Sequence, residues 1–204
     1  MKFRQIQAGV MTMDVNTEVI LKDKYGNIKP VWQDNKLCMY LIKKGKLNPA
    51  WINRWYAFLL KPFLGHWALS KKYANLVVNA GLAAAASRLN GDGGEAVFAS
   101  IGQGVGTNAA AAGDTALQTE KKADGTTSTI HAIAAATASR ITGSVTNDTA
   151  QWVGTINETA VMAITESGVF NATTAGTLLC RQTFTAVNVI SGDSLQFTWQ
   201  VKNS

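Results

Sequence analysis

The chain has 204 residues, of which 47% are hydrophobic and 16% are charged, with 18 glycines and only three prolines. This length and composition predict a globular, β-rich protein of one large domain or two small ones, and they exclude a disordered chain. The net charge of +6 is unevenly spread: residues 1–72 hold 13 Lys and Arg against four Asp and Glu, whereas residues 73–204 hold six against nine.

The basic first third could meet nucleic acid, anionic lipid or an acidic protein surface. Nucleic-acid binding favours clustered arginines with interleaved aromatic residues, but this segment has only Arg4 and Arg54 among scattered lysines. We therefore expect an acidic protein partner, and no nucleic acid. The N-terminus lacks the features of a signal peptide, and the most apolar window, residues 51–69, is interrupted by charges and by Pro62, so we expect no membrane span.

Two β-rich runs at residues 17–22 and 28–33 flank Gly26-Asn27 and predict a hairpin, in which Pro30 makes the second strand an edge or ends its pairing early. Residues 35–45 then predict a short helix that stops at Gly45. A second helix is expected over residues 50–60, opened by Asn48-Pro49.

Large aromatic side chains are concentrated between residues 51 and 67. A segment of about 70 residues buries little by itself, so we expect several of these side chains to face a partner, the alternative being a small self-contained core. Interfaces are enriched in such residues and have a polar rim. The expected interface consists of Trp51, Trp55, Tyr56, Phe58, Phe63 and Trp67, with Lys43, Lys44 and Lys61 around them.

After a composition shift near residues 70–72 we expect a domain boundary between residues 74 and 75. Residues 75–89 predict a helix and residues 96–101 a strand. The glycine-rich segment 102–106 is not a dinucleotide fingerprint, because Thr107 stands where the third glycine belongs and no helix follows at once. A glycine-rich bend leaving a strand is the better interpretation.

The remainder predicts antiparallel strands at residues 130–141 and 149–156, followed by three closing strands between residues 161 and 201. In the last of these, Leu195, Phe197, Trp199 and Val201 alternate with polar residues, as a half-buried strand requires. We also expect a kink or bulge at Gly168 and one helical turn over residues 114–118.

The predicted fold is mainly β: an antiparallel, jelly-roll-like β-sandwich at residues 75–204 with a small α/β attachment region at residues 1–74. Two distant cysteines, Cys38 and Cys180, indicate a reducing compartment, with Cys180 in the core.

No catalytic or metal-binding motif stands out. The two histidines, His66 and His131, have no ligand-like neighbours, so neither a metal nor a cofactor is expected. Two carboxylate pairs, Asp92 with Glu95 and Glu158 with Glu166, could serve glycoside hydrolysis. We expect instead that the first pair caps a loop and the second flanks a strand, which predicts a protein that is not an enzyme.

Residues 75–204 contain a series of short motifs: NLVVNAGL at 75–82, IG at 101–102, AGDTAL at 112–117, TNDT at 146–149, ITESGVFN at 164–171, LLCRQTF at 178–184 and SGDSL at 191–195. In this order they resemble a family of tailed-bacteriophage virion proteins, whose members are labelled as head-decorating or tail-associated. The resemblance implies a non-enzymatic, homo-oligomeric particle component with a β-sandwich body, assembled in the host cytoplasm.

The leading expectation is a capsid decoration or cement protein whose partner is the major capsid protein. The alternative within this class is a tail, collar, baseplate or fibre component that binds tail or baseplate proteins. A carbohydrate-binding or depolymerase module is the alternative from another class.

Overall fold

The computed structural model describes residues 13–44, 46, 65–127 and 134–203. It is mainly β, with 48% strand and 11% helix, and its strands pair antiparallel, which confirms the expected sandwich-like fold. The elements, in chain order, are β1 (Met13–Lys22), β2 (Ile28–Lys29), β3 (Val31–Asp34), α1 (Lys36–Lys43), β4 (Gly65–Ala68), β5 (Lys71–Val77), α3 (Asn79–Asn90), β6 (Ser100–Gly104), β7 (Ala134–Ala135), β8 (Thr137–Ile141), β9 (Thr149–Asn157), β10 (Met162–Phe170), β11 (Leu178–Val189) and β12 (Ser194–Asn203).

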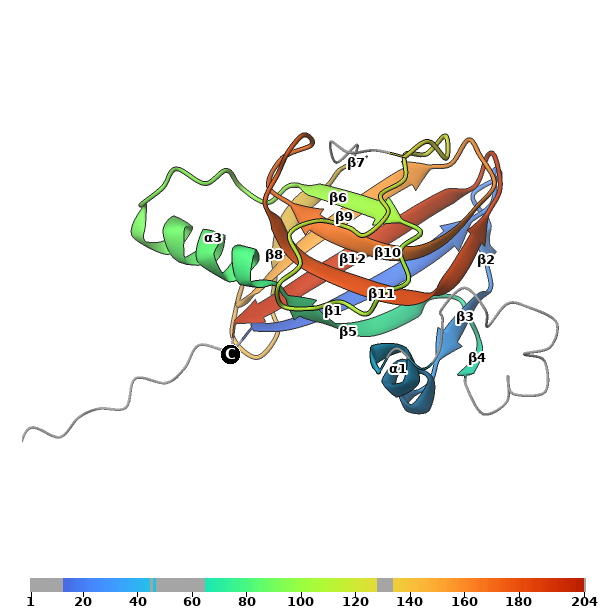
Figure 1. The fold of residues 1–204 in the computed structure, drawn as a ribbon, viewed down its shortest axis with the longest axis horizontal. Coiled ribbons are helices and arrows are strands. Elements are labelled where there is room, and N and C mark those ends of the chain that lie inside the picture. The colour runs from blue at the N-terminus through green and yellow to red at the C-terminus, as the bar shows by residue number, and fades with distance from the viewer. Residues whose placement is uncertain (1–12, 45, 47–64, 128–133, 204) are drawn as a thin grey trace, which may run out of the picture.

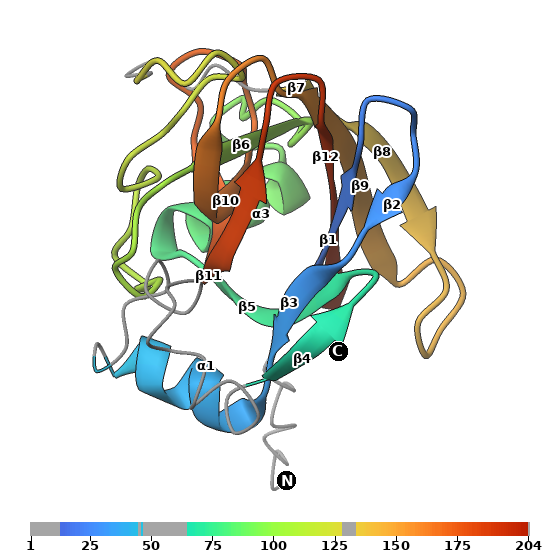
Figure 2. The ribbon, with the colours of Figure 1, turned by 90° about the vertical axis from the view of Figure 1, so that its right-hand side faces the viewer.

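Ten strands form one sheet in the order β7-β6-β10-β11-β5-β1-β12-β9-β8, with β2 attached to β1. The sheet turns a corner at β5, because its first five residues pair with β1 whereas Leu76 and Val77 pair with β11. It turns again between β7 and β8, which one residue separates in the chain. Strand β7 pairs with β6, whereas β8 pairs with β9. The result is two facing layers, which are seen end-on in Figure 2.

The core lies between these layers. The alternation predicted at residues 195–201 is confirmed, since Leu195, Phe197 and Trp199 are fully buried. From the opposite layer Phe184 contacts Phe197 and stacks on Tyr73, with ring centroids 6.4 and 5.7 Å apart. Burying each such side chain stabilises the fold by roughly 1.5–3 kcal/mol.

The predicted first hairpin is also confirmed. Its turn is held by Asp23, whose carboxylate accepts hydrogen bonds from the backbone N–H groups of Tyr25 and Asn27, while Gly26 takes the left-handed conformation (φ 86°). Pro30 separates β2 from β3, and β3 pairs with β4 in a second, two-stranded sheet. Proline therefore ends the pairing with β1, as expected.

The strand pairing runs across the expected boundary between residues 74 and 75. This boundary falls inside β5, and β1 lies between β5 and β12 in the large sheet. Val19 and Leu21 of β1 are buried in the same core cluster as Phe197. Residues of the first third therefore supply an inner strand of the sandwich, because their apolar face needs this core.

Several element boundaries differ from the sequence predictions. Residues 75–77 are strand and not helix, since they pair with β1 and β11, and α3 begins at Asn79. The strand expected from residue 96 begins at Ser100. The helical turn expected at residues 114–118 is absent. The register shifts of β10 lie between Ile164 and Glu166 and between Val169 and Phe170, so Gly168 stays in register. The helix expected at residues 50–60 lies outside the described residues.

Candidate interaction surfaces

The glycine-rich segment continues from β6 into a loop, residues 105–119, that crosses the outer face of β10 and β11 (Figure 1). Beneath this loop the Glu166 carboxylate is fully buried and accepts backbone hydrogen bonds from Gly106, Gln118 and Thr119 at 2.8–3.0 Å. It also accepts a hydrogen bond of 2.8 Å from the Arg181 guanidinium. One carboxylate thus fixes both ends of the loop.

Arg181 extends this network to the middle of the loop. Its side chain is 2% exposed, and it donates to the Asp114 carboxylate at 2.7 Å and to the Asn108 carbonyl at 3.2 Å. We call Asp114, Glu166 and Arg181 the buried charge network. Charges in a protein interior are tolerated only when paired and hydrogen-bonded in this way.

The buried charge network explains why glycine occurs at positions 104 and 106. A Cβ atom at Gly104 or Gly106 would lie 2.5 or 2.4 Å from Glu166 Oε1, so a side chain at either position would collide with the carboxylate. The close approach of backbone to Glu166 requires glycine there. The interpretation of this segment as a bend leaving a strand is confirmed, since β6 ends at Gly104.

Of the two carboxylate pairs considered for hydrolysis, the second does not simply flank a strand, because Glu166 lies inside β10. Both oxygens of Glu166 are taken up by the network. Glu158 follows β9 and is 1% exposed; burial and, to a smaller extent, the nearby Asp193 carboxylate raise its pKa to about 7. Its oxygens complete no hydrogen bond within the described ranges, although Gln103 lies close enough to lower this pKa somewhat. The Glu95 carboxylate accepts from Asn171 at 2.8 Å.

The two-stranded sheet formed by β3 and β4 projects beside the sandwich (Figure 2), and each of its strands carries a tryptophan. Trp32 is buried, whereas Trp67 is 59% exposed, and their rings meet edge-on with centroids 5.8 Å apart. Both line a groove of about 170 Å³ between this strand pair and the sandwich, together with Leu21, Pro30, Val31 and Val187. We call this antiparallel strand pair the aromatic hairpin, although its two strands are not consecutive, because α1 lies between β3 and β4 in the chain.

Asp34 fastens the aromatic hairpin to the sandwich. This buried carboxylate accepts hydrogen bonds from the hydroxyls of Tyr73 (2.5 Å) and Thr185 (2.8 Å) and from the Cys38 thiol (3.3 Å). Burial, and then the neighbouring Asp34 charge, raise the pKa of Tyr73 well above its ordinary value. The hairpin therefore has a fixed orientation relative to β5 and β11.

The confirmed helix α1 follows directly. Asn35 caps it, since its side-chain oxygen accepts a hydrogen bond from the Cys38 backbone at 2.9 Å. The helix exposes Leu37 and Tyr40, which are 51% and 55% exposed and one helical turn apart. The sequence analysis did not select these two residues, although their spacing marks one face of the helix.

Of the predicted interface residues, the structure places three. Trp67 is exposed on the aromatic hairpin, Lys43 ends α1, and Lys44 is exposed after it. Leu69, 63% exposed and two residues beyond Trp67, was not predicted. The remaining predicted residues lie outside the described ranges: Trp51, Trp55, Tyr56, Phe58, Lys61 and Phe63.

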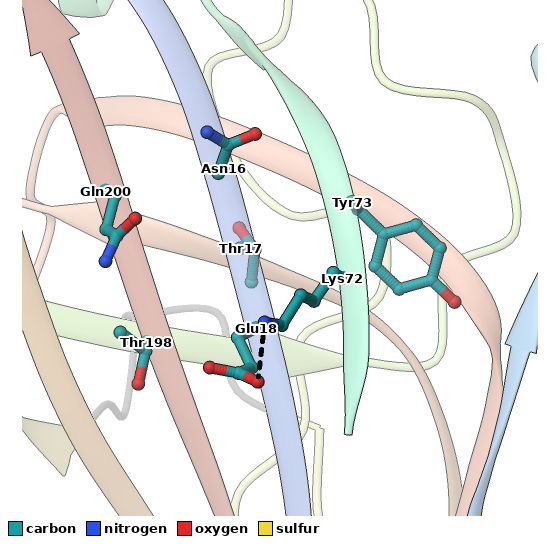
Figure 3. A pocket seen from close by; sticks show the side chains of 7 residues that line it. All are labelled: Asn16, Thr17, Glu18, Lys72, Tyr73, Thr198 and Gln200. Atoms are coloured by element: carbon teal, nitrogen blue, oxygen red, sulfur yellow. Dashed lines mark ion pairs between the residues drawn. The ribbon is translucent and has the colours of Figure 1, made fainter. Parts of the chain in front are cut away.

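A second, polar groove of about 360 Å³ lies on the large sheet (Figure 3). Its lining comes from three neighbouring strands, β5, β1 and β12: Asn16, Thr17, Glu18, Lys72, Tyr73, Thr198 and Gln200. Glu18 and Lys72 form an ion pair at 3.6 Å. Sequence reasoning missed this groove because its residues are distant along the chain.

Within the described part of the chain, no helix is long and apolar enough to cross a membrane. The same residues contain no group of three or more His, Cys, Asp and Glu side chains placed to hold a metal ion. In comparisons with known proteins, the chain matches no family model, no curated protein and no solved structure.

Proposed function

We propose that the chain is a non-enzymatic structural component of a tailed-bacteriophage particle, in which it decorates or cements the capsid shell as a homo-oligomer. The strongest support for this proposal is that residues from the motifs that carry the resemblance contact one another in the fold. Asp114, Glu166 and Arg181 come from three of these motifs and meet in the buried charge network. The motifs thus specify a rigid body, as a particle component needs, and the Glu166 carboxylate is held in a structural position.

The aromatic hairpin is the proposed attachment site on this body. Trp67 and Leu69 supply exposed apolar area, and the exposed Lys44 and Lys46 follow β3 and α1 in the chain. An apolar centre with a basic rim fits an acidic surface of another virion protein, and the major capsid protein is the proposed partner.

Labelling of intact particles tests the location. Antibodies against the purified chain, viewed by electron microscopy on particles of the phage that encodes it, should mark many sites over the head. A ring of label at one vertex would instead support a tail, collar or baseplate component. Particles without label at either place would refute a virion role.

Truncating Trp67 tests the attachment site. Removing an aromatic anchor from an interface commonly costs about 2 kcal/mol or more, equivalent to roughly 30-fold weaker binding. Trp67→Ala should therefore lose most of its co-sedimentation with particles that lack the protein, while its circular dichroism spectrum stays unchanged. Leu89→Ala is the matched control, because Leu89 is 76% exposed on α3, at the other end of the molecule (Figure 1). Equal losses in both variants would contradict this site.

Lys44 tests the basic rim. A rim charge mainly accelerates encounter and is screened by salt. Lys44→Ala should therefore weaken particle binding mildly, and more at low salt than at high salt. A loss that does not depend on salt would show that Lys44 does not act through its charge.

A further inference from the structure

The polar groove of Figure 3 is built on the outward face of β1 and β12. Asn16 lies opposite Gln200, and Glu18 lies opposite Thr198, in the antiparallel register of these strands. Side chains of one strand alternate between faces, so these four share the face that points away from the core residues Val19 and Phe197. Lys72 of β5, opposite Glu18 on the other side, completes the row. The groove is therefore a solvent-facing feature of the sheet.

The Gln200 amide is held in place before any ligand binds. Gln200 Nε2 donates to Gln151 Oε1 at 2.9 Å, and Gln151 Nε2 donates to the Ser139 hydroxyl at 3.3 Å, which makes a ladder across β12, β9 and β8. The ladder occupies the Gln200 nitrogen and turns its oxygen toward β1, where Asn16 points its amide nitrogen toward β12 (Figure 3). Side chains that are already ordered lose less entropy on binding.

The chemistry of the lining selects the class of ligand. Glu18 and Lys72 neutralise each other as an ion pair, so the groove presents no net charge to a ligand. The amides of Asn16 and Gln200 and the hydroxyl of Thr198 offer both donors and acceptors. A polyanion would find one lysine that is already paired, whereas a neutral chain of hydroxyl groups can both donate and accept along the row.

From this geometry we propose that the groove binds a neutral carbohydrate. A volume of about 360 Å³ is within the usual range for small-ligand sites, roughly 300–1,000 Å³. A sugar hydroxyl between β1 and β12 accepts from Asn16 and donates to Gln200, and the next hydroxyl reaches Thr198. None of the residues that line this groove belongs to β3 or β4, and the proposal does not depend on a virion role.

Titration of the full chain with neutral oligosaccharides tests this site. Hexasaccharides of glucose, galactose, mannose and N-acetylglucosamine, added at millimolar concentration, should include at least one that shifts the backbone amide resonances of Asn16, Thr198 and Gln200. Gln200→Ala and Asn16→Ala should each weaken that binding about three- to tenfold, as expected for losing one or two hydrogen bonds. Asn188→Ala is the matched control, since this exposed amide belongs to the groove beside the aromatic hairpin.

The possible results separate the alternatives. Binding that Gln200→Ala weakens and Asn188→Ala does not would support the proposal. The absence of binding to all four sugars, binding insensitive to Gln200→Ala, or selective binding of a sulfated polysaccharide or an extended peptide would overturn it. Trp67→Ala should leave sugar binding unchanged, so failure of this proposal and failure of the attachment site are distinguishable.

Discussion

Replacing Glu166 by glutamine would put an amide nitrogen into a site where every contacting group is a donor. The carboxylate accepts hydrogen bonds from three backbone N–H groups and from Arg181. Whichever way the amide turns, its NH₂ group faces donors. The substitution also removes one of the two carboxylates that pair with the Arg181 guanidinium, whose side chain is only 2% exposed. Arg181 would then keep an ion pair with Asp114 alone.

The size of the effect follows from burial. Removing one partner of a buried ion pair costs roughly 3–5 kcal/mol, because the other charge stays buried without full compensation. Natural domains are stable by only about 5–15 kcal/mol. For a chain of this length, each kcal/mol lowers Tm by about 2–4 °C, so Glu166→Gln should lower it by roughly 6–20 °C.

Urea unfolding followed by tryptophan fluorescence measures this difference. Glu18→Gln is the matched control: its ion pair with Lys72 spans 3.6 Å and is largely exposed, and such pairs contribute about 0–1 kcal/mol. A Glu166→Gln protein within about 1 kcal/mol of wild type would refute the reasoning. Faster proteolysis at residues 105–119, with a normal Tm, would show that the network holds only the loop.

Two further substitutions test other parts of the interior. Because burial raises the pKa of Glu158 to about 7 from 4.5, the folded state retains a proton that the unfolded chain releases, and stability should fall as pH rises from about 4.5 through about 7. Glu158→Gln should flatten this decline in Tm between about pH 5 and pH 8, and an unchanged profile would contradict it. At Gly81 of α3, a Cβ atom would lie 2.2 Å from the Leu179 carbonyl oxygen of β11, so Gly81→Ala must push the helix away. The strain, roughly 1–3 kcal/mol, should exceed the gain in helix propensity of about 1 kcal/mol, and a variant more stable than wild type in a thermal melt would refute this.

The parts of the fold that could be predicted depend on local patterns. Alternation of period two identified β12, and turn residues identified the hairpin before Pro30. Residues 75–77 were misassigned because alanine-rich helical sequence follows them directly, whereas pairing of Leu76 and Val77 with β11 decides their conformation. Propensity is a weak guide where tertiary pairing competes with it.

The buried charge network shows why the rest could not be predicted. Strand β11 is buried on both faces, so its sequence lacks the alternation that would mark an outer face. The polar residues around Glu166 resembled an interruption between two strands. Nothing in the local sequence indicates that a loop 47–60 residues earlier covers these residues. One signal could have indicated the network: β10 carries a single charged residue, a Glu, and β11 a single charged residue, an Arg. Closely spaced glycines precede both strands in the sequence.

The two candidate surfaces differ in the same way: the sequence indicated residues of one surface and gave no sign of the other. An excess of aromatic and basic residues in the first third of the chain singled out Trp67 and Lys44, and both are exposed in the structure. The polar groove gave no such signal, because Asn16, Lys72 and Gln200 become neighbours only through strand pairing. Its residues are also ordinary ones for the solvent face of a strand.

The two surfaces are connected through β5, where Lys72 of the polar groove contacts the aromatic hairpin through its backbone. Its backbone N–H and carbonyl bind the Gln33 side chain of β3 at 2.7 and 3.1 Å, whereas its side chain pairs with Glu18 in the polar groove. The next residue of β3, Asp34, binds Tyr73 and Thr185. These contacts join the aromatic hairpin to both layers of the sandwich without a flexible linker. If the attachment and the sugar binding proposed above both hold, a copy docked through Trp67 would present its polar groove at a fixed angle to the partner.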